Sequence, residues 1–166
     1  MWIETPTNPT LKVGDIRKLC QLAREHGILT VVDNTFASPY LQSPILLGAD
    51  VVVHSCTKYI GGHTDVLMGA ICLNDKDLYE RLMFTAKSFG PSPSPFDCYN
   101  ALRSLKTLKV RMEAAVKNAY VVANFLNNHP KVEKVVYPGL KNHPQHEIAM
   151  DQMRGPGAMI TIYVKG

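Results

Sequence analysis

The sequence lacks any apolar run that approaches the ~20 residues of a membrane-spanning helix. Its first residues, Met1 to Pro6, have neither the basic start nor the long apolar stretch of a signal peptide. The 18 Lys and Arg residues are scattered and form no basic stripe of the kind that nucleic-acid binding needs. We therefore expect no membrane partner, no nucleic-acid partner and a cytoplasmic location.

Cysteine and metal-ligand patterns are also scarce. The four cysteines show no CxxC spacing, which favours reduced thiols over disulfides or a zinc site. His143 and His146 are separated by Pro144, and no third ligand pattern accompanies them, so we expect no metal site. Gly61 and Gly62 do not complete a phosphate-binding loop of the nucleotide type.

What is present is an ordinary globular composition, 46% hydrophobic and 19% charged, in a chain of 166 residues. That length can bury a real core. The order of the predicted elements, a strand at residues 2–4, a helix at 16–26 and strands at 28–32, 50–54 and 67–73, indicates an α/β domain. A helix over 75–90, with Leu78, Leu82 and Met83 inward, and a helix of ~30 residues over 96–126, straight or bent, follow. The remainder, 132–137, 144–153 and 158–164, is expected to be strand, helix and strand.

The stretch after the apolar run Val51–Val53 carries the chemistry. Ser55 and Thr57 bear hydroxyl groups that can hold a phosphate beside a glycine-bearing turn. Lys58 follows them, and a lysine at the mouth of a buried strand can be partly desolvated, which frees its amine to form a Schiff base. A plain surface lysine after a core strand is the alternative that this stretch alone leaves open.

A second apolar run, Ile28–Val32, ends in Asp33. A carboxylate at the C-terminal end of a parallel strand points into the crevice where α/β sheets bind ligands. Pyridoxal phosphate needs a lysine for its aldehyde, a carboxylate for its pyridine nitrogen and a phosphate cradle. Lys58, Asp33 and the pair Ser55/Thr57 supply these three requirements from two strand ends. Asn8 can present an amide to the same ligand, or it is simply a turn residue.

Seven segments, distributed from end to end of the chain, match one known family. They are Glu4–Pro9, Asp33–Thr35, Ser55–Asp65, Ser94–Tyr99, Leu105–Leu108 with Arg111-Met112, Tyr137–Leu140 and His143–Glu147. Together they resemble the trans-sulfuration (Cys/Met metabolism) enzymes, which depend on pyridoxal 5′-phosphate, and within that family they are most similar to the eukaryotic γ-lyases. Ser104 departs from the pattern, because the family usually has glycine there.

The resemblance implies a fold. The chain would be part of the large domain of a fold-type I PLP-dependent transferase, a mainly parallel sheet flanked by helices, followed by a long linking helix and the start of a smaller α/β C-terminal domain. We expect residues 1–110 to belong to the cofactor-binding domain and 111–166 to the linking helix and the second domain. The resemblance also implies that this is the central part of a longer polypeptide.

The resemblance further implies a function. Lys58 would be the catalytic lysine, and Asp33, Ser55, Thr57, Lys58 and Asn8 would bind the cofactor, with Asn8 at its ring hydroxyl. The implied reaction is carbon–sulfur cleavage of L-cystathionine to L-cysteine, 2-oxobutyrate and ammonia, with hydrogen sulfide formed from cysteine as a second product. The assembly would be a homotetramer. A γ-synthase, a β-lyase, a methionine γ-lyase or a truncated, non-catalytic homologue remain as alternatives, and we expect the 166 residues alone to be inactive. His63 and Asp65 would support the lysine loop, or form an ordinary polar loop.

Overall fold

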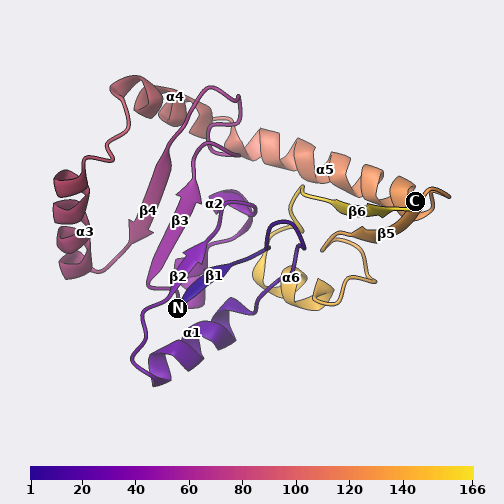
Figure 1. Ribbon diagram of the computed structural model, residues 1–166, viewed down its shortest axis with the longest axis horizontal. Helices are drawn as coiled ribbons and strands as arrows, with labels where there is room; N and C mark the ends of the chain where they lie inside the picture. The colour runs from indigo at the N-terminus through magenta and orange to yellow at the C-terminus, as the bar shows by residue number, and fades with distance from the viewer.

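A four-stranded mixed sheet forms the centre of the computed structural model, which describes residues 1–166 (Figure 1). Its strands are β1 (Trp2–Glu4), β2 (Val31–Asp33), β3 (Val51–Ser55) and β4 (Gly69–Leu73), in the spatial order β1-β2-β3-β4. The first three run parallel, and β4 runs antiparallel to β3. The carboxyl ends of β1, β2 and β3 therefore meet at one edge of the sheet. The predicted α/β class with a mainly parallel sheet is confirmed.

Helix α1 (Ile16–Glu25) packs on one face of this sheet. The side chain of Asp15 accepts a hydrogen bond from Lys18 N at 3.1 Å and so caps the first turn, as the sequence predicts. Gly27, at φ +64°, takes the left-handed conformation that ends the helix. The apolar face of α1 meets the strands in one buried cluster made of Ile3, Ile16, Cys20, Val32, Ala49 and Val52.

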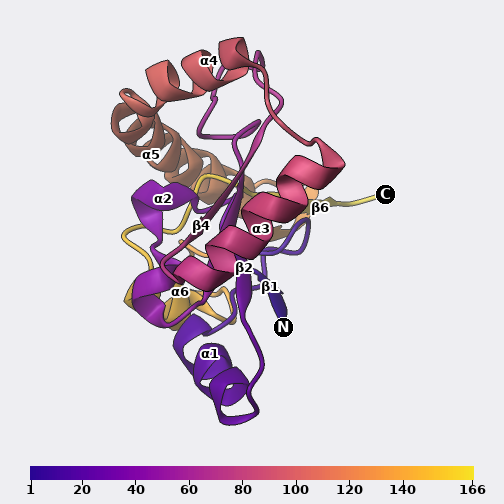
Figure 2. The same cartoon turned by 90° about the vertical axis from the view of Figure 1, so that its left-hand side faces the viewer.

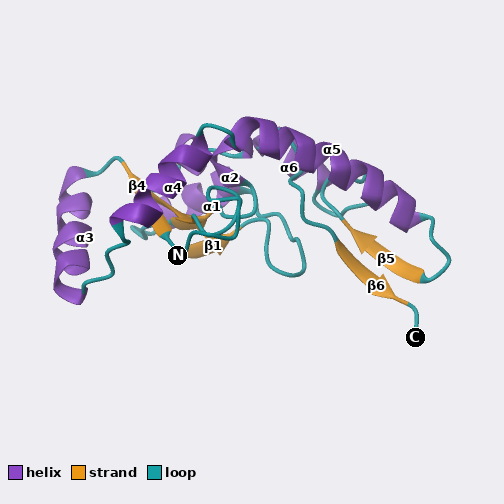
Figure 3. Ribbon diagram, turned by 90° about the horizontal axis from the view of Figure 1, so that it is seen from above, coloured by secondary structure: helices purple, strands orange, loops and turns teal.

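The remaining elements connect the strands or follow the sheet in the chain. Two short helical segments, α2 (Ser38–Leu41) and the 3-10 helix η1 (Pro44–Leu47), lie between β2 and β3. The elements after β4 are α3 (Lys76–Phe89), α4 (Pro95–Leu105), α5 (Leu108–Asn127), β5 (Val132–Val136), α6 (His146–Gln152) and β6 (Thr161–Val164). Helix α5 runs from α4 to the antiparallel pair β5-β6 (Figures 1 and 3). It packs there through Ala119 and Ala123 against Val135 and Tyr137.

Three sequence expectations are wrong in detail. Strand β2 spans Val31–Asp33 and not 28–32, because Ile28 and Leu29 remain 49% and 54% exposed in a connection from α1. The helix expected over 96–126, straight or bent, is two separate helices with a break at residues 106–107. Helix α3 (Figure 2) buries no residue, and Met83 is 42% exposed.

The C-terminal elements also contact the first part of the chain. Ala149 of α6 and Met153 just after it share a buried cluster with Ala37, Leu41, Leu108 and Met112. The expected division at residue 110 stays a prediction. All four cysteines are free thiols. No helix is both long and apolar enough to cross a membrane.

Candidate active site

The carboxyl edge of the sheet brings the predicted site residues together from three elements. Asp33, the last residue of β2, is in register with Glu4 of β1 and Val53 of β3. Side chains alternate along a strand, so Asp33, Val53 and Ser55 face the same side of the sheet, opposite to the side that Val32 and Val52 bury under α1. From the strand spacing and rise, the Cα atoms of Asp33 and Ser55 lie roughly 8 Å apart. One small ligand can therefore contact both.

The Asp33 carboxylate is half-buried and is held in place on one side only. Its Oδ1 accepts a hydrogen bond from Thr35 N at 3.0 Å, while its Oδ2 has no protein partner. Thr35 also connects the two strand ends, because its Oγ1 accepts a hydrogen bond from Ser55 N at 2.8 Å. One carboxylate oxygen of Asp33 is thus available to a ligand donor such as a protonated ring nitrogen.

Lys58 lies on a tight turn that begins where β3 ends. Lys58 N donates to Ser55 O at 3.1 Å, Gly62 N donates to Lys58 O at 2.8 Å, and Gly61 N donates to Cys56 O at 2.7 Å. The side chain of Lys58 is exposed and forms neither an ion pair nor a hydrogen bond. The desolvation expected from the sequence is therefore absent in this chain. What the turn supplies is a fixed backbone position for a free amine.

The two hydroxyl groups differ. Ser55 is half-buried, and its hydroxyl has no protein partner. The Thr57 hydroxyl accepts a hydrogen bond from Met68 N at 3.2 Å and donates to Met68 O at 3.4 Å, which attaches the loop to the residue before β4. A phosphate would find the Ser55 hydroxyl free, but Thr57 must give up its long bond to the carbonyl before it can donate.

Asn8 lies in the loop that follows β1, at the same edge of the sheet. Its backbone N donates to Glu4 Oε1 at 3.2 Å, and its exposed side-chain amide has no protein partner. The amide can therefore reach a ligand without breaking any contact. The Asn8 side chain is also compatible with an ordinary turn, the alternative left open by the sequence.

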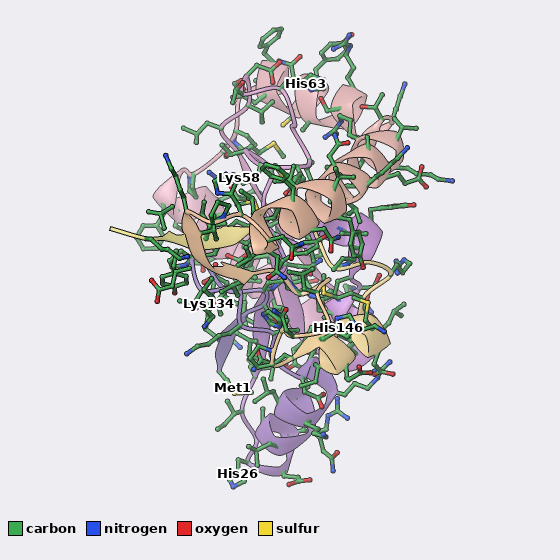
Figure 4. All side chains as sticks on the ribbon, turned by 90° about the vertical axis from the view of Figure 1, so that its right-hand side faces the viewer. Met1, His26, Lys58, His63, Lys134 and His146 are labelled. Atoms are coloured by element: carbon green, nitrogen blue, oxygen red, sulfur yellow. The ribbon has the colours of Figure 1, made fainter.

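Figure 4 shows Lys58 and His63 toward one end of the molecule, with Met1 and His26 at the other. His63 supports the loop rather than the ligand: its Nδ1 lies 2.8 Å from Gly61 O and 3.4 Å from the hydroxyl of buried Ser104. A cavity of about 670 Å³, lined by Arg24, Asp50 and Asp75 among others, opens at the other, amino end of β3 and takes no part in this arrangement.

Comparison with known proteins agrees with this geometry. The model of the Cys/Met metabolism PLP-dependent enzyme family matches residues 1–166. The chain belongs to this family. Pyridoxal phosphate, the cofactor predicted from the sequence, is thereby confirmed.

Relatives in the Cys/Met metabolism PLP-dependent enzyme family carry more than one activity. The chain is 58% identical to cystathionine gamma-lyase of Dictyostelium discoideum, over 100% of this chain and 43% of that protein. It is also 58% identical to a probable cystathionine gamma-synthase of Herpetosiphon aurantiacus, over 100% of this chain and 52% of that protein. Cystathionine gamma-synthase from Xanthomonas oryzae pv. oryzae in complex with cystathionine superimposes with a TM-score of 0.98 at 45% identity, covering 99% of this chain and 43% of that one. The chain thus spans about half the length of these relatives or slightly less.

The residues at the sheet edge fit the family's cofactor by their chemistry. A carboxylate oxygen, a hydroxyl and an amine, all without protein partners, stand on Asp33, Ser55 and Lys58. Their individual roles stay predictions. An unpartnered group of another kind lies just beneath them: His54 on β3 is 7% exposed, and its Nδ1 has no hydrogen-bond partner. Burial lowers the pKa of His54, and the nearby charge of Asp33 partly opposes that shift.

Sequence reasoning missed a buried network of polar side chains that lies beneath the carboxyl ends of β1 and β2. The side chain of Gln42 donates to Asn34 Oδ1 at 2.8 Å and to Thr5 O at 3.2 Å. Gln152 of α6 donates to Gln42 Oε1 at 3.1 Å and accepts from Ile16 N at 3.1 Å. These residues join the ends of β1 and β2 to α1 and α6. Nothing in the periodicity identifies them, since a buried glutamine looks like a surface residue in a sequence.

The histidine pair considered for metal binding is engaged with the backbone instead. His143 Nε2 lies 3.0 Å from Leu11 O, and His143 Nδ1 accepts from Gln145 N at 3.1 Å. His146 Nδ1 lies 2.8 Å from Pro138 O. Both rings thus connect loops to one another.

Proposed function

We propose that this chain provides the cofactor-binding lysine and its surroundings in a PLP-dependent carbon–sulfur lyase. The substrate would be L-cystathionine, which reacts with one water to give L-cysteine, 2-oxobutyrate and ammonia. The observation that carries the proposal is the meeting of Asp33, Ser55 and Lys58 at one edge of the sheet, each with an atom free for a ligand. The preference for a lyase rests on the similarity to several such enzymes: besides the Dictyostelium protein, the cystathionine gamma-lyases of Rattus norvegicus and Homo sapiens are 53% and 54% identical to this chain.

Each residue has one task in this proposal. The cofactor, when bound, supplies an electron sink for the bond pair left on the substrate's Cα. Asp33 holds the proton on the ring nitrogen through its free carboxylate oxygen. Ser55 and Thr57 donate to the phosphate, a charge-assisted contact. Lys58 Nζ would hold the cofactor covalently, and its amine would remove and return protons at the substrate's Cα and the neighbouring carbon. Asn8 donates to the ring hydroxyl.

The second candidate is a γ-synthase, which forms cystathionine. It is favoured by the equal identity to the Herpetosiphon protein and by the close superposition on the Xanthomonas enzyme. A β-lyase, a methionine γ-lyase and a non-catalytic homologue have less support. The partner-free amine, hydroxyl and carboxylate oxygen argue against the non-catalytic alternative, because such a protein has no need for all three.

We also propose a homotetramer in the cytoplasm, with residues 1–110 in the cofactor-binding domain and 111–166 in the linking helix and second domain. Light scattering of the holoenzyme tests the assembly. An active monomer would refute it.

The activity is tested by supplying the holoenzyme with L-cystathionine alone. The lyase proposal predicts cysteine and 2-oxobutyrate in equal amounts. A holoenzyme that carries the cofactor on Lys58 and leaves cystathionine intact would reject the lyase and favour the synthase.

A further inference from the structure

Arg111, in the first turn of α5, grips the backbone directly after Lys58. Its Nη1 donates to Tyr59 O at 2.6 Å, and its Nη2 donates to Ile60 O at 3.3 Å. The same Nη2 donates to Ser104 O at 3.0 Å, and Nε donates to Thr107 Oγ1 at 3.1 Å. One planar guanidinium group therefore joins the lysine loop to the last turn of α4 and to the start of α5.

The Arg111 guanidinium group forms hydrogen bonds only to these backbone and hydroxyl oxygens. No carboxylate pairs with Arg111, and partial burial lowers its pKa from the ordinary value for arginine. The carbonyl of Ser104 belongs to the last turn of α4, where carbonyl groups carry partial negative charge, and it also accepts hydrogen bonds from Thr107 N at 3.1 Å and Thr107 Oγ1 at 3.0 Å. A rigid fork of N–H donors suits several carbonyls at once, whereas a lysine can only offer a point charge.

The loop is shaped to admit this side chain. Gly62 has φ +72°, and a Cβ atom built on it would lie 2.2 Å from Arg111 Nη1. The guanidinium group thus packs against bare backbone four residues after the lysine. Ser104, where the family usually has glycine, adds a hydroxyl group 3.4 Å from His63 Nδ1 on the same loop.

We propose that Arg111 is a positioning residue for Lys58. By holding the carbonyls of Tyr59 and Ile60, it fixes the turn that aims the amine at the carboxyl edge of the sheet. The Lys58 side chain has no contact of its own, so its position depends on this turn. The inference rests on the proposed role of Lys58, and its test separates the two.

The test compares attachment of pyridoxal phosphate in the wild type, Arg111→Met and Arg111→Lys. Arg103→Met is the matched control, because Arg103 is exposed on α4 and its side chain makes no hydrogen bond. Attachment is followed by the visible absorption of the bound cofactor at increasing cofactor concentration. Borohydride reduction and peptide mapping then locate the attachment. Amide hydrogen exchange at Gly61 and Gly62, and the urea unfolding curve, are measured on the same samples.

We expect Arg111→Met to lower the saturating rate of attachment at Lys58 by ~10-fold or more, since small misplacements of a reacting group are costly. The half-saturating concentration should stay near that of the wild type, because Ser55 and Thr57 are untouched. Exchange at Gly61 and Gly62 should accelerate, Arg111→Lys should recover part of the rate, and Arg103→Met should match the wild type.

Attachment of Arg111→Met at the wild-type rate would overturn the inference. So would a parallel loss of rate, affinity and folded fraction in both Arg111 variants, which indicates a purely structural role. If the wild type itself carries no cofactor on Lys58, the proposed function fails first, and the exchange data still report whether Arg111 holds the loop.

Discussion

Replacing Gly62 by alanine is a sharp test of how the lysine loop is built. The residue has φ +72°, and the added Cβ would lie 2.2 Å from Arg111 Nη1 and 2.6 Å from Arg111 Cζ. The guanidinium group is the far end of a flexible side chain, so it can move away. Moving away, however, breaks the hydrogen bond from its Nη1 to the carbonyl of Tyr59.

The expected cost has two parts. Left-handed backbone costs a non-glycine residue about 1–2 kcal/mol. Loss of one charge-assisted hydrogen bond adds about 1.5–3 kcal/mol. The free energy of unfolding should therefore fall by roughly 2.5–5 kcal/mol for Gly62→Ala. Gly27→Ala is the matched control: its φ is +64°, and nothing lies within 4 Å of the added Cβ, so only the backbone term of about 1–2 kcal/mol applies.

Urea unfolding, followed by circular dichroism, measures both costs, and a double-mutant cycle isolates the second part. In an Arg111→Met background, Gly62→Ala should cost no more than Gly27→Ala does. Equal costs for the two glycine variants in the wild-type background would refute the reasoning. A Gly62 cost that is unchanged by Arg111→Met would refute it too.

Three further predictions concern the site. Asp33→Asn should lower kcat for elimination more than ~10-fold while Lys58 still binds the cofactor, because the amide cannot hold the ring nitrogen protonated. Steady-state kinetics with peptide mapping tests this, and turnover within a few fold of the wild type would contradict it. Burial lowers the pKa of His54, so the unfolded chain binds more protons, and the free energy of unfolding falls as pH drops below about 6.5, by at most ~1.4 kcal/mol per pH unit for this group. Between pH 7 and 5 the free energy of unfolding of His54→Gln should depend less on pH than that of the wild type, and an equal dependence in both proteins would rule His54 out. The 166-residue chain expressed alone should not turn over cystathionine, because its Lys58 is exposed and it spans 43% of the Dictyostelium lyase; release of 2-oxobutyrate at a rate typical of a complete lyase would contradict this.

The sequence predicts best those structural features that depend on neighbouring residues in the chain, such as helix ends and buried strands. The cap at Asp15 and the stop at Gly27 define α1, and the apolar run before Ser55 defines β3. The error in β2 arises because Ile28 and Leu29 are apolar yet exposed. The sequence has no Gly or Pro, the usual helix-breaking residues, at the break between α4 and α5. This break coincides with the tertiary contacts of Arg111, which no local pattern encodes.

The candidate site divides in the same way. Asp33, Ser55 and Lys58 could be named because each follows a strand signal, and strand ends of a parallel sheet meet at one edge. The engagement of Thr57 with Met68, the exposure of Lys58 and the network around Gln42 depend on distant segments. The sequence therefore identifies the candidate cofactor-binding residues better than it predicts the contacts that hold those residues in place.

Whether Lys58 carries the cofactor is tested by borohydride reduction of the holoenzyme followed by peptide mapping. A pyridoxyl group should be found on Lys58 alone, and Lys58→Ala should carry none. A modification found on Lys106 or Lys109 instead, both exposed around the start of α5, would contradict it.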